Sequence, residues 1–128
     1  MAKQVIHTTA APAAIGPYSQ AIRVADTLYT SGQIALDPAT GQLVAGDVRA
    51  QAERVMANLR AVVEAAGLTM ADIVRTTIYL ANIDDFATVN EVYGVAFPTD
   101  PPARSTIQAA ALPRGALVEI DAIARSDS

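Results

Sequence analysis

The chain has 128 residues, a net charge of −4 and a sequence pI near 4.7. This length corresponds to one domain covering residues 1–128, and 52% apolar against 17% charged residues is typical of a globular protein. The absence of cysteine excludes disulfides, thiolate nucleophiles and Cys-based metal sites, and a single histidine cannot supply a catalytic histidine pair. The acidic charge balance repels polyanions and argues against a nucleic-acid partner.

The N-terminal half of the chain predicts two strands followed by a long helix. Strands at 21–25 and 28–34 are joined by a tight turn. Asp47 can cap a helix over about 48–66, where apolar residues form one stripe at helical spacing, and Gly67 is placed to end it. No apolar run approaches the roughly 20 residues that cross a bilayer, and no signal-peptide core follows the N-terminus. We therefore expect a cytoplasmic protein that makes no membrane contact.

The C-terminal half predicts a strand, a second helix and two further strands. β-Branched residues dominate 73–80, and Asp84 begins a helix that ends before Pro98. Strands at about 104–110 and 117–124 complete the chain. This order predicts an α+β fold with a mainly antiparallel sheet and two helices on one face.

The last predicted strand carries apolar residues on both of its faces. Leu117 and Ile123 flank Glu119 and Asp121 on one face, and the other face is apolar throughout. Two helices can cover only one side of the sheet, so the uncovered side must bury its apolar residues elsewhere. We expect it to pack against copies of the same chain.

Two charged residues stand out in the last two predicted strands. Arg104 follows two prolines at the head of one strand, and Glu119 lies inside the next, where an unpaired charge is costly. A guanidinium offers a rigid fork of donors that matches a carboxylate, and a positioned carboxylate can activate water as a general base. The pair predicts a site for a small organic acid. The alternative is that each residue belongs to a structural ion pair.

A simple hairpin around residues 113–115 would keep these two side chains apart. In that register Glu119 faces Ala109, roughly 16 Å along the strand from Arg104 at about 3.3 Å per residue. Either the strands are not direct neighbours, or Arg104 of one subunit meets Glu119 of another. We favour the second alternative, because the uncovered face of the sheet already predicts an interface.

Several motifs, in order along nearly the whole chain, resemble those of the RidA family of reactive intermediate deaminases, formerly YjgF. They are Gly16-Pro17-Tyr18-Ser19-Gln20-Ala21, Thr30-Ser31-Gly32-Gln33-Ile34, Phe86-Ala87-x-Val89-Asn90-x-Val92-Tyr93, Pro102-Ala103-Arg104-Ser105, Leu112-Pro113-x-Gly115 and Val118-Glu119-Ile120-x-Ala122-Ile123-Ala124. The resemblance implies a chorismate-mutase-like fold and a homotrimer with sites at the subunit interfaces. We find no cofactor or metal motif.

The resemblance also implies roles for individual residues. It assigns the substrate carboxylate to Arg104 and the hydrolytic water to Glu119. Tyr18 follows a rigid Gly-Pro bend and becomes a substrate-positioning group, and Asn90 becomes a pocket contact. The residues alone are equally compatible with a core tyrosine at 18, and they favour a helix-surface amide at 90.

Backbone groups complete the predicted site. Gly32 follows Ser31 where a predicted strand is interrupted, and glycine there often marks the close approach of a ligand, although a plain bulge explains it almost as well. Thr106 stands where many members of the family have cysteine. Only the backbone N–H of Thr106, together with that of Gly32, is needed to bind a carboxylate oxygen. The threonine therefore casts doubt on thiol chemistry at this position and not on the deaminase activity that the resemblance implies.

The resemblance implies a deaminase that converts 2-enamino and 2-imino acids, such as products of pyridoxal-phosphate dehydratases, to 2-oxo acids and ammonia. Its role would be to protect other enzymes from a reactive intermediate. A non-catalytic binder of small carboxylates would use the same Arg104 without needing Glu119. Nuclease or translation-inhibitor activity has been attached to relatives, but nine basic against thirteen acidic residues fit it poorly.

Overall fold

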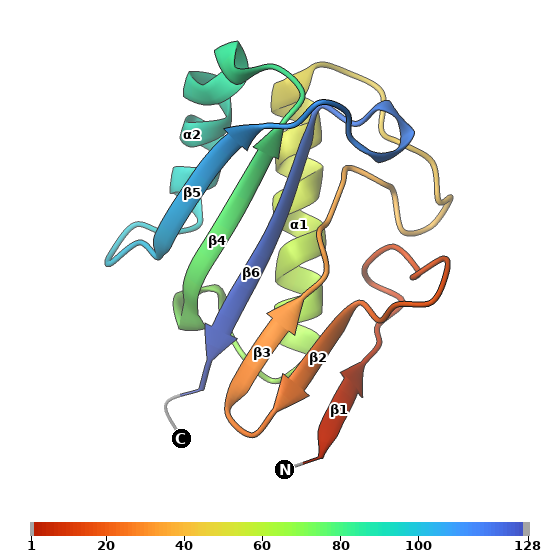
Figure 1. Cartoon of the computed structure of the whole chain (residues 1–128), viewed down its shortest axis with the longest axis vertical. Helices are drawn as coiled ribbons and strands as arrows, with labels where there is room; N and C mark the ends of the chain where they lie inside the picture. The colour runs from red at the N-terminus through yellow and green to blue at the C-terminus, as the bar shows by residue number, and fades with distance from the viewer. Residues whose placement is uncertain (1, 127–128) are drawn as a thin grey trace.

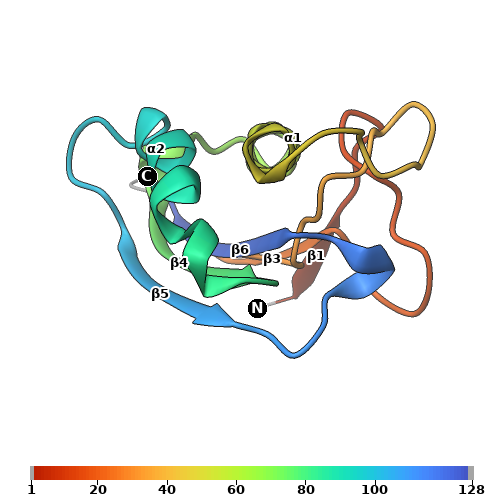
Figure 2. The ribbon, with the colours of Figure 1, turned by 90° about the horizontal axis from the view of Figure 1, so that it is seen from above.

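The computed structural model describes residues 2–126, which form one six-stranded sheet with two helices on one side (Figures 1 and 2). The strands are β1 (Lys3–Ile6), β2 (Ala21–Val24), β3 (Thr27–Thr30), β4 (Ile73–Leu80), β5 (Ala103–Gln108) and β6 (Val118–Arg125). The helices are α1 (Val48–Ala65) and α2 (Phe86–Val95), with 3-10 turns η1 (Met70–Asp72), η2 (Ile83–Asp85) and η3 (Pro113–Gly115). The predicted α+β class and the placement of both helices on one face are confirmed.

The strands lie in the order β1-β2-β3-β6-β4-β5. Every neighbouring pair is antiparallel except β4 and β5, which run parallel. Two strands joined through a helix are expected to pair in this way, because the crossover returns the chain to the same end of the sheet. The sheet is therefore mixed but mainly antiparallel, as predicted.

Local signals set the ends of α1. The Asp47 side chain accepts a hydrogen bond from the backbone N–H of Ala50 (3.0 Å), and Gly67 adopts a positive φ of 80° just beyond the helix. Both of these predicted signals are confirmed. Within residues 2–126, neither helix has the length and apolar character to cross a bilayer. The cytoplasmic location stays a prediction from the sequence.

The core between the helices and the sheet fixes which way each strand faces. Fully buried side chains come from α1 and from alternate positions of the central strands: Leu28, Val55, Leu59, Val62, Ile78, Leu80, Val118 and Ile120. Side chains alternate along a strand, so the residues between these positions point away from the helices. In β6 that side carries Glu119 and Asp121.

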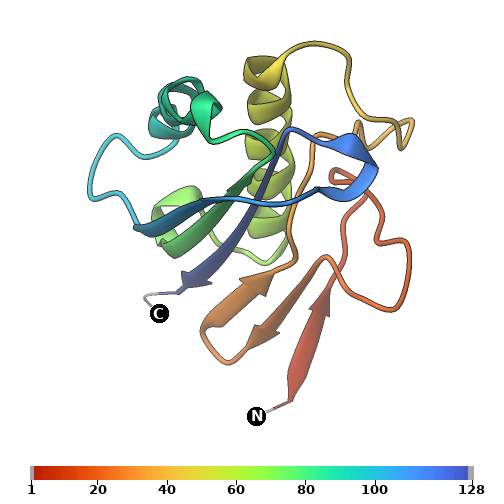
Figure 3. The ribbon, with the colours of Figure 1, turned by 45° about the horizontal axis from the view of Figure 1, so that its top comes forward.

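The predicted hairpin between the last two strands is wrong. β5 lies at the edge of the sheet beside β4, and β6 lies between β4 and β3. The connection passes over the end of β4 (Figure 3), where the N–H of Ala109 donates to Leu80 O (2.8 Å) and that of Ala81 to Leu117 O (3.0 Å). The crossover through α2 places β5 on the outer side of β4, so the chain must step over β4 to form β6. The predicted alternative that the two strands are not neighbours is therefore correct.

Candidate active site

Arg104 lies on the helix-covered side of β5 and is held by one face of α2. Its Nη1 donates to Asn90 Oδ1 (2.7 Å), and its Cζ lies 5.4 Å from the centre of the Phe86 ring and 5.0 Å from that of Tyr93. The three helix residues follow i, i+4 and i+7 spacing, which places them on the same side of a helix. The guanidinium is thus fixed by one hydrogen bond and two aromatic rings.

Two threonines surround this position. Thr76, opposite Arg104 in the register of β4 and β5, is fully buried and shares a 2.6 Å hydrogen bond with the Tyr93 hydroxyl. Burial raises the pKa of Tyr93, which keeps the phenol neutral. Thr106, two residues beyond Arg104, has a buried hydroxyl with no hydrogen-bond partner among the described residues. A polar group of a ligand beside Arg104 would find this hydroxyl unoccupied.

Neither Arg104 nor Glu119 belongs to an ion pair in the described part of the chain. The pairs found there join Arg49 to Glu91 and Arg125 to Asp26. The structural alternative for the two candidate catalytic residues is therefore not observed within residues 2–126. Among the described residues, the charge on Arg104 is partnered by a neutral amide and by ring faces, and it stays available to an external anion.

Glu119 lies on the other side of the sheet, in an open cleft of about 580 Å³. The cleft is lined by Ala13, Ile15, Tyr18, Ser31, Gly32, Leu36, Pro113, Arg114 and Glu119. Three of the predicted substrate-binding residues therefore share one cleft with the predicted general base.

Gly32 packs directly against the Glu119 carboxyl group. A Cβ atom at residue 32 would overlap that carboxyl group, so a larger residue here would have to displace the Glu119 carboxyl. Backbone hydrogen bonds between Gln33 and Ile120, of 2.8 Å and 3.1 Å, hold this segment against β6. The N–H of Gly32 donates to nothing within residues 2–126 and is free to meet a ligand.

Ser31 ties the loop that carries Tyr18 to the sheet. Its hydroxyl donates to the carbonyl of Ser19 (2.6 Å), and its N–H donates to the carbonyl of Gln20 (2.9 Å). The Tyr18 side chain is 54% exposed, so it is not the core tyrosine of the alternative hypothesis. Its hydroxyl accepts a 3.3 Å hydrogen bond from the N–H of Ile15 at the mouth of the cleft.

The surroundings of Glu119 favour its protonated form. Burial raises the pKa of Glu119 above its ordinary value, and the negative charge of Asp121 raises it further. Asp121 is itself held by the Tyr79 hydroxyl, which donates to its Oδ2 (3.0 Å). A carboxylate whose pKa is shifted towards neutrality is a stronger general base near pH 7.

The seven predicted site residues form two groups rather than one. The arginine group is Asn90, Arg104 and Thr106. The glutamate group is Tyr18, Ser31, Gly32 and Glu119. Arg104 pairs with Thr76 and Glu119 with Tyr79, so three residues and two strand spacings put the two Cα atoms roughly 14 Å apart. Their side chains also point to opposite sides of the sheet, and one small substrate cannot touch both within a single chain.

The sequence interpretation missed several residues around these groups. Phe86 and Tyr93 belong to one of the motifs that resemble the family, but the sequence interpretation does not place their rings against Arg104. The i, i+7 spacing of Phe86 and Tyr93, with Asn90 between them, is the signal that could have placed all three residues on one side of the helix. Asp121 was visible as a second carboxylate two residues from Glu119, a spacing that places both on one face of a strand.

No group of three or more His, Asp or Glu side chains that could hold a metal ion occurs within residues 2–126. The chain also lacks cysteine, which removes thiolate ligands. Independence from metal and cofactor stays a prediction from the sequence.

Known proteins resemble this chain along nearly its whole length. The family model described as Endoribonuclease L-PSP matches residues 8–126. Protein DfrA of Myxococcus xanthus is 59% identical over 128 residues, covering 98% of both chains. The 2-iminobutanoate/2-iminopropanoate deaminase of Mus musculus is 53% identical over 122 residues, or 95% of this chain and 90% of the relative. The crystal structure of YyfA from Yersinia pestis, a member of the conserved Rid protein family, has 51% identity and a TM-score of 0.95 over 98% of this chain and 100% of that one.

The family model covers both helices, every strand except β1 and both groups of site residues. The similarities also agree with the chorismate-mutase-like architecture predicted from the motifs. On this basis the chain belongs to the RidA (YjgF) family, whose sequence model carries the description Endoribonuclease L-PSP.

Proposed function

We propose that the protein is a cofactor-independent deaminase that hydrolyses 2-imino acids, and the 2-enamino acids that tautomerise to them, to 2-oxo acids and ammonia. One observation carries the proposal: within residues 2–126 the fold holds a guanidinium without a carboxylate partner and a glutamate whose pKa burial raises. Hydrolysis of an imino acid needs these two groups, one for the carboxylate and one for the water. A relative of 53% identity that bears the name of such a deaminase supports the proposal.

We propose further that each site joins the arginine group of one subunit to the glutamate group of another, in a homotrimer. The opposite orientation of the two groups within one chain supports this arrangement. β5 is an edge strand with an unpaired row of backbone groups, which is a natural place for another chain to bind. The uncovered side of the sheet also exposes apolar area, with Tyr29 50% and Ile107 49% exposed.

In this site the substrate is positioned by its carboxylate. Arg104 binds the carboxylate through two parallel hydrogen bonds, while Asn90 keeps the guanidinium in place. The free N–H of Gly32 and the N–H of Thr106 approach the same carboxylate oxygens, and Tyr18 contacts the rest of the substrate. Holding an electrophilic imine beside one oriented water supplies most of the rate enhancement.

Glu119 moves one proton in each half of the reaction. As the water oxygen bonds to C2, Glu119 accepts a proton from the water, the C=N π electrons move to the nitrogen, and Glu119 passes that proton to the nitrogen. In the second half Glu119 accepts the proton of the carbinolamine hydroxyl as the carbonyl forms and the C–N bond breaks. Glu119 then gives this proton to the departing nitrogen, so one imine and one water give one 2-oxo acid and one ammonia, and Glu119 ends ionised.

RNA cleavage, the activity in the name of the family model, is not the function that we propose. A net charge of −4 opposes the binding of a polyanion. The single imidazole, His7, is exposed, and one histidine cannot supply a pair of acid and base imidazoles within one chain.

The first test supplies 2-imino acid from a pyridoxal-phosphate dehydratase and measures the release of 2-oxo acid and ammonia. The wild type should accelerate release, and Arg104→Ala and Glu119→Gln should each remove the acceleration. If Glu119→Gln still binds a 2-oxo acid and retains full activity, the water-activating role is wrong. If the wild type binds the acid without any acceleration, the protein is a carboxylate-binding protein rather than an enzyme.

The second test asks whether two subunits share a site. Equal amounts of the two inactive variants are unfolded together and refolded, so that subunits mix at random. A shared site is intact only when its arginine comes from one variant and its glutamate from the other, which restores about a quarter of wild-type activity in a symmetric oligomer. No recovery from a well-folded mixture would contradict the shared site.

A further inference from the structure

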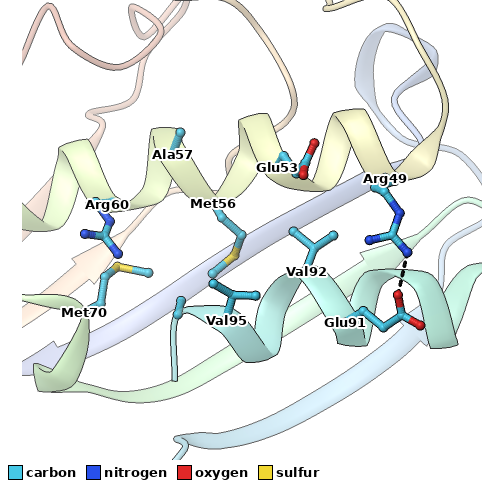
Figure 4. Close-up of a pocket in the computed structure, with 10 residues that line it drawn as sticks. Arg49, Glu53, Met56, Ala57, Arg60, Met70, Glu91, Val92 and Val95 are labelled. Carbon is cyan, nitrogen blue, oxygen red and sulfur yellow. Dashed lines mark hydrogen bonds and ion pairs between the residues drawn. The ribbon is translucent and has the colours of Figure 1, made fainter. Parts of the chain in front are cut away.

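A second cleft, of about 330 Å³, lies between α1 and α2 (Figure 4). It is lined by Arg49, Glu53, Met56, Ala57, Arg60, Met70, Glu91, Val92, Val95 and Ala96. None of the residues of the arginine or glutamate groups belongs to this set. Its volume lies at the lower end of the range for small-molecule sites, about 300 to 1,000 Å³.

The middle of the cleft is apolar. Met56 and Met70 form its floor and are 8% and 6% exposed, whereas Val95 on the wall of α2 is 82% exposed. A valine so exposed beside two methionines offers apolar surface that a ligand can cover. Methionine side chains also adapt to ligands of varied shape.

The two ends of the cleft differ in charge. At one end Arg49 and Glu91 form an ion pair that bridges the two helices, and Glu53 lies one helical turn from Arg49 (Figure 4). At the other end the guanidinium of Arg60 extends from α1 towards Met70 (Figure 4), with no ion pair or hydrogen bond within residues 2–126. The Arg49–Glu91 pair closes this end of the cleft, so an extended chain cannot run through it. The Glu53 carboxylate, which has no ion pair within residues 2–126, disfavours an anion at the same end.

We propose that this cleft binds a short apolar monocarboxylic acid. The carboxylate pairs with Arg60, and the hydrocarbon chain lies over Met56, Val92 and Val95 towards the Arg49–Glu91 pair. Among the lining residues, Arg60 is the one cation without an ion pair to any described residue, which gives the ligand one direction. A single charge contact and a small apolar surface limit the affinity to the millimolar range.

Self-association would leave the cleft open. The proposed subunit contacts use the uncovered side of the sheet, the edge of β5 and the face of α2 that carries Asn90, whereas the cleft lies on the side of α2 that carries Val92 and Val95 and faces α1 (Figure 4). The inference therefore does not depend on the proposed deaminase activity.

Methyl groups of methionine report binding directly, because two of the three methionines line the cleft. We expect hexanoate to shift the ¹³C-methyl signals of Met56 and Met70, and hexanol or hexylammonium to shift them less at the same concentration. Arg60→Gln should weaken the hexanoate response by about fivefold, as expected for loss of one solvent-accessible ion pair. Val95→Asp, at an exposed position that should tolerate a polar residue, should abolish it. Lys3→Gln removes an exposed charge outside the cleft and should change nothing.

Three results would overturn the proposal. Hexanol shifting both signals as strongly as hexanoate would show that Arg60 does not select a carboxylate. If hexanoate shifts the two methyl signals of folded Arg60→Gln as strongly as those of the wild type, Arg60 does not bind the carboxylate. A response that disappears in Arg104→Ala would come from the substrate site instead, whereas its persistence there supports the cleft whether or not the deaminase proposal holds.

Discussion

The arginine group and the glutamate group are built in different ways. Arg104 is held by Phe86, Asn90 and Tyr93, which all come from one helix. The glutamate group is assembled from the Tyr18 loop, the Ser31–Gly32 segment and β6, and Pro113 and Arg114 also line its cleft. The first group depends on helical spacing, and the second depends on contacts between distant parts of the chain.

This difference separates the two functions that a hydrolytic site needs. A helix face with a hydrogen bond and two rings fixes a cation whether or not a substrate is present, so it suits binding. The close contact between Glu119 and the Gly32 backbone fixes the Glu119 carboxylate relative to the N–H of Gly32. The glutamate group is therefore suited to aligning a water with the substrate. Changes in the glutamate group should therefore reduce the rate, and changes in the arginine group should weaken binding.

Apart from substitutions of Arg104 and Glu119 themselves, the largest effect is expected from Gly32→Ala. The added Cβ would overlap the Glu119 carboxyl group, and displacement of a reacting group by about 1 Å costs on the order of 100-fold in rate. We expect kcat/KM to fall by about this factor, mainly through kcat. Gly94→Ala is the matched control, because a Cβ there meets nothing within 4 Å. Wild-type activity in a folded Gly32→Ala protein would show that the Glu119 position is not critical.

A smaller effect, on binding, is expected from Asn90→Asp. The substitution keeps the shape of the side chain but places a carboxylate 2.7 Å from Arg104 Nη1, where it competes with the substrate carboxylate. We expect KM to rise by about tenfold while kcat changes little. Asn90→Ala, which removes the hydrogen bond without adding charge, should raise KM less. A drop in kcat at constant KM would place Asn90 in the chemical step instead.

Much of the fold could be predicted because its signals are local. Asp47, Gly67 and the β-branched run at 73–80 mark the ends of α1 and the extent of β4, and the structure follows them closely. The neighbour of β5 could not be found in the same way. The short connection around residues 113–115 favoured a hairpin, while the strand-helix-strand order of β4, α2 and β5 favoured parallel pairing, and the second signal prevailed.

The site also has a part that local sequence signals predict and a part that depends on contacts between distant residues. The residue types at Arg104 and Glu119 were sufficient to predict an acid-binding cation and a water-activating carboxylate. The side of the sheet on which each lies depends on register, and a shift of one residue reverses it. The close approach of Gly32 to Glu119 depends on the bridge between Gln33 and Ile120, which are far apart in the chain and carry no local signal.

The pH dependence of activity can test the environment of Glu119. Its raised pKa means that the ionised base is lost as the pH falls through a value above that of an ordinary glutamate, so kcat/KM should decline on the acid side. Asp121→Asn removes one cause of the shift, and the acid limb should move to lower pH. Glu64→Gln, on the exposed side of α1, should leave the limb in place. An unmoved limb in Asp121→Asn would indicate that Asp121 does not influence the base.

The smallest expected effect is on thermal stability. It is an increase, whereas most substitutions lower stability. Because the folded-state pKa of Glu119 is raised, the fold favours the neutral form, and ionisation above that pKa destabilises the folded state. Glu119→Gln should therefore raise Tm at pH 7 by roughly 2 °C, since partial exposure limits the gain. The difference should vanish at a pH below the ordinary glutamate pKa, where Glu119 is protonated in both the folded and the unfolded wild type.

Thermal unfolding of the wild type and Glu119→Gln at the two pH values measures this difference, with Glu64→Gln as the control. A Glu119→Gln protein less stable than wild type at pH 7 would mean that the ionised carboxylate makes favourable contacts in the folded assembly, and the glutamate would then be a structural residue rather than a base kept at the expense of stability.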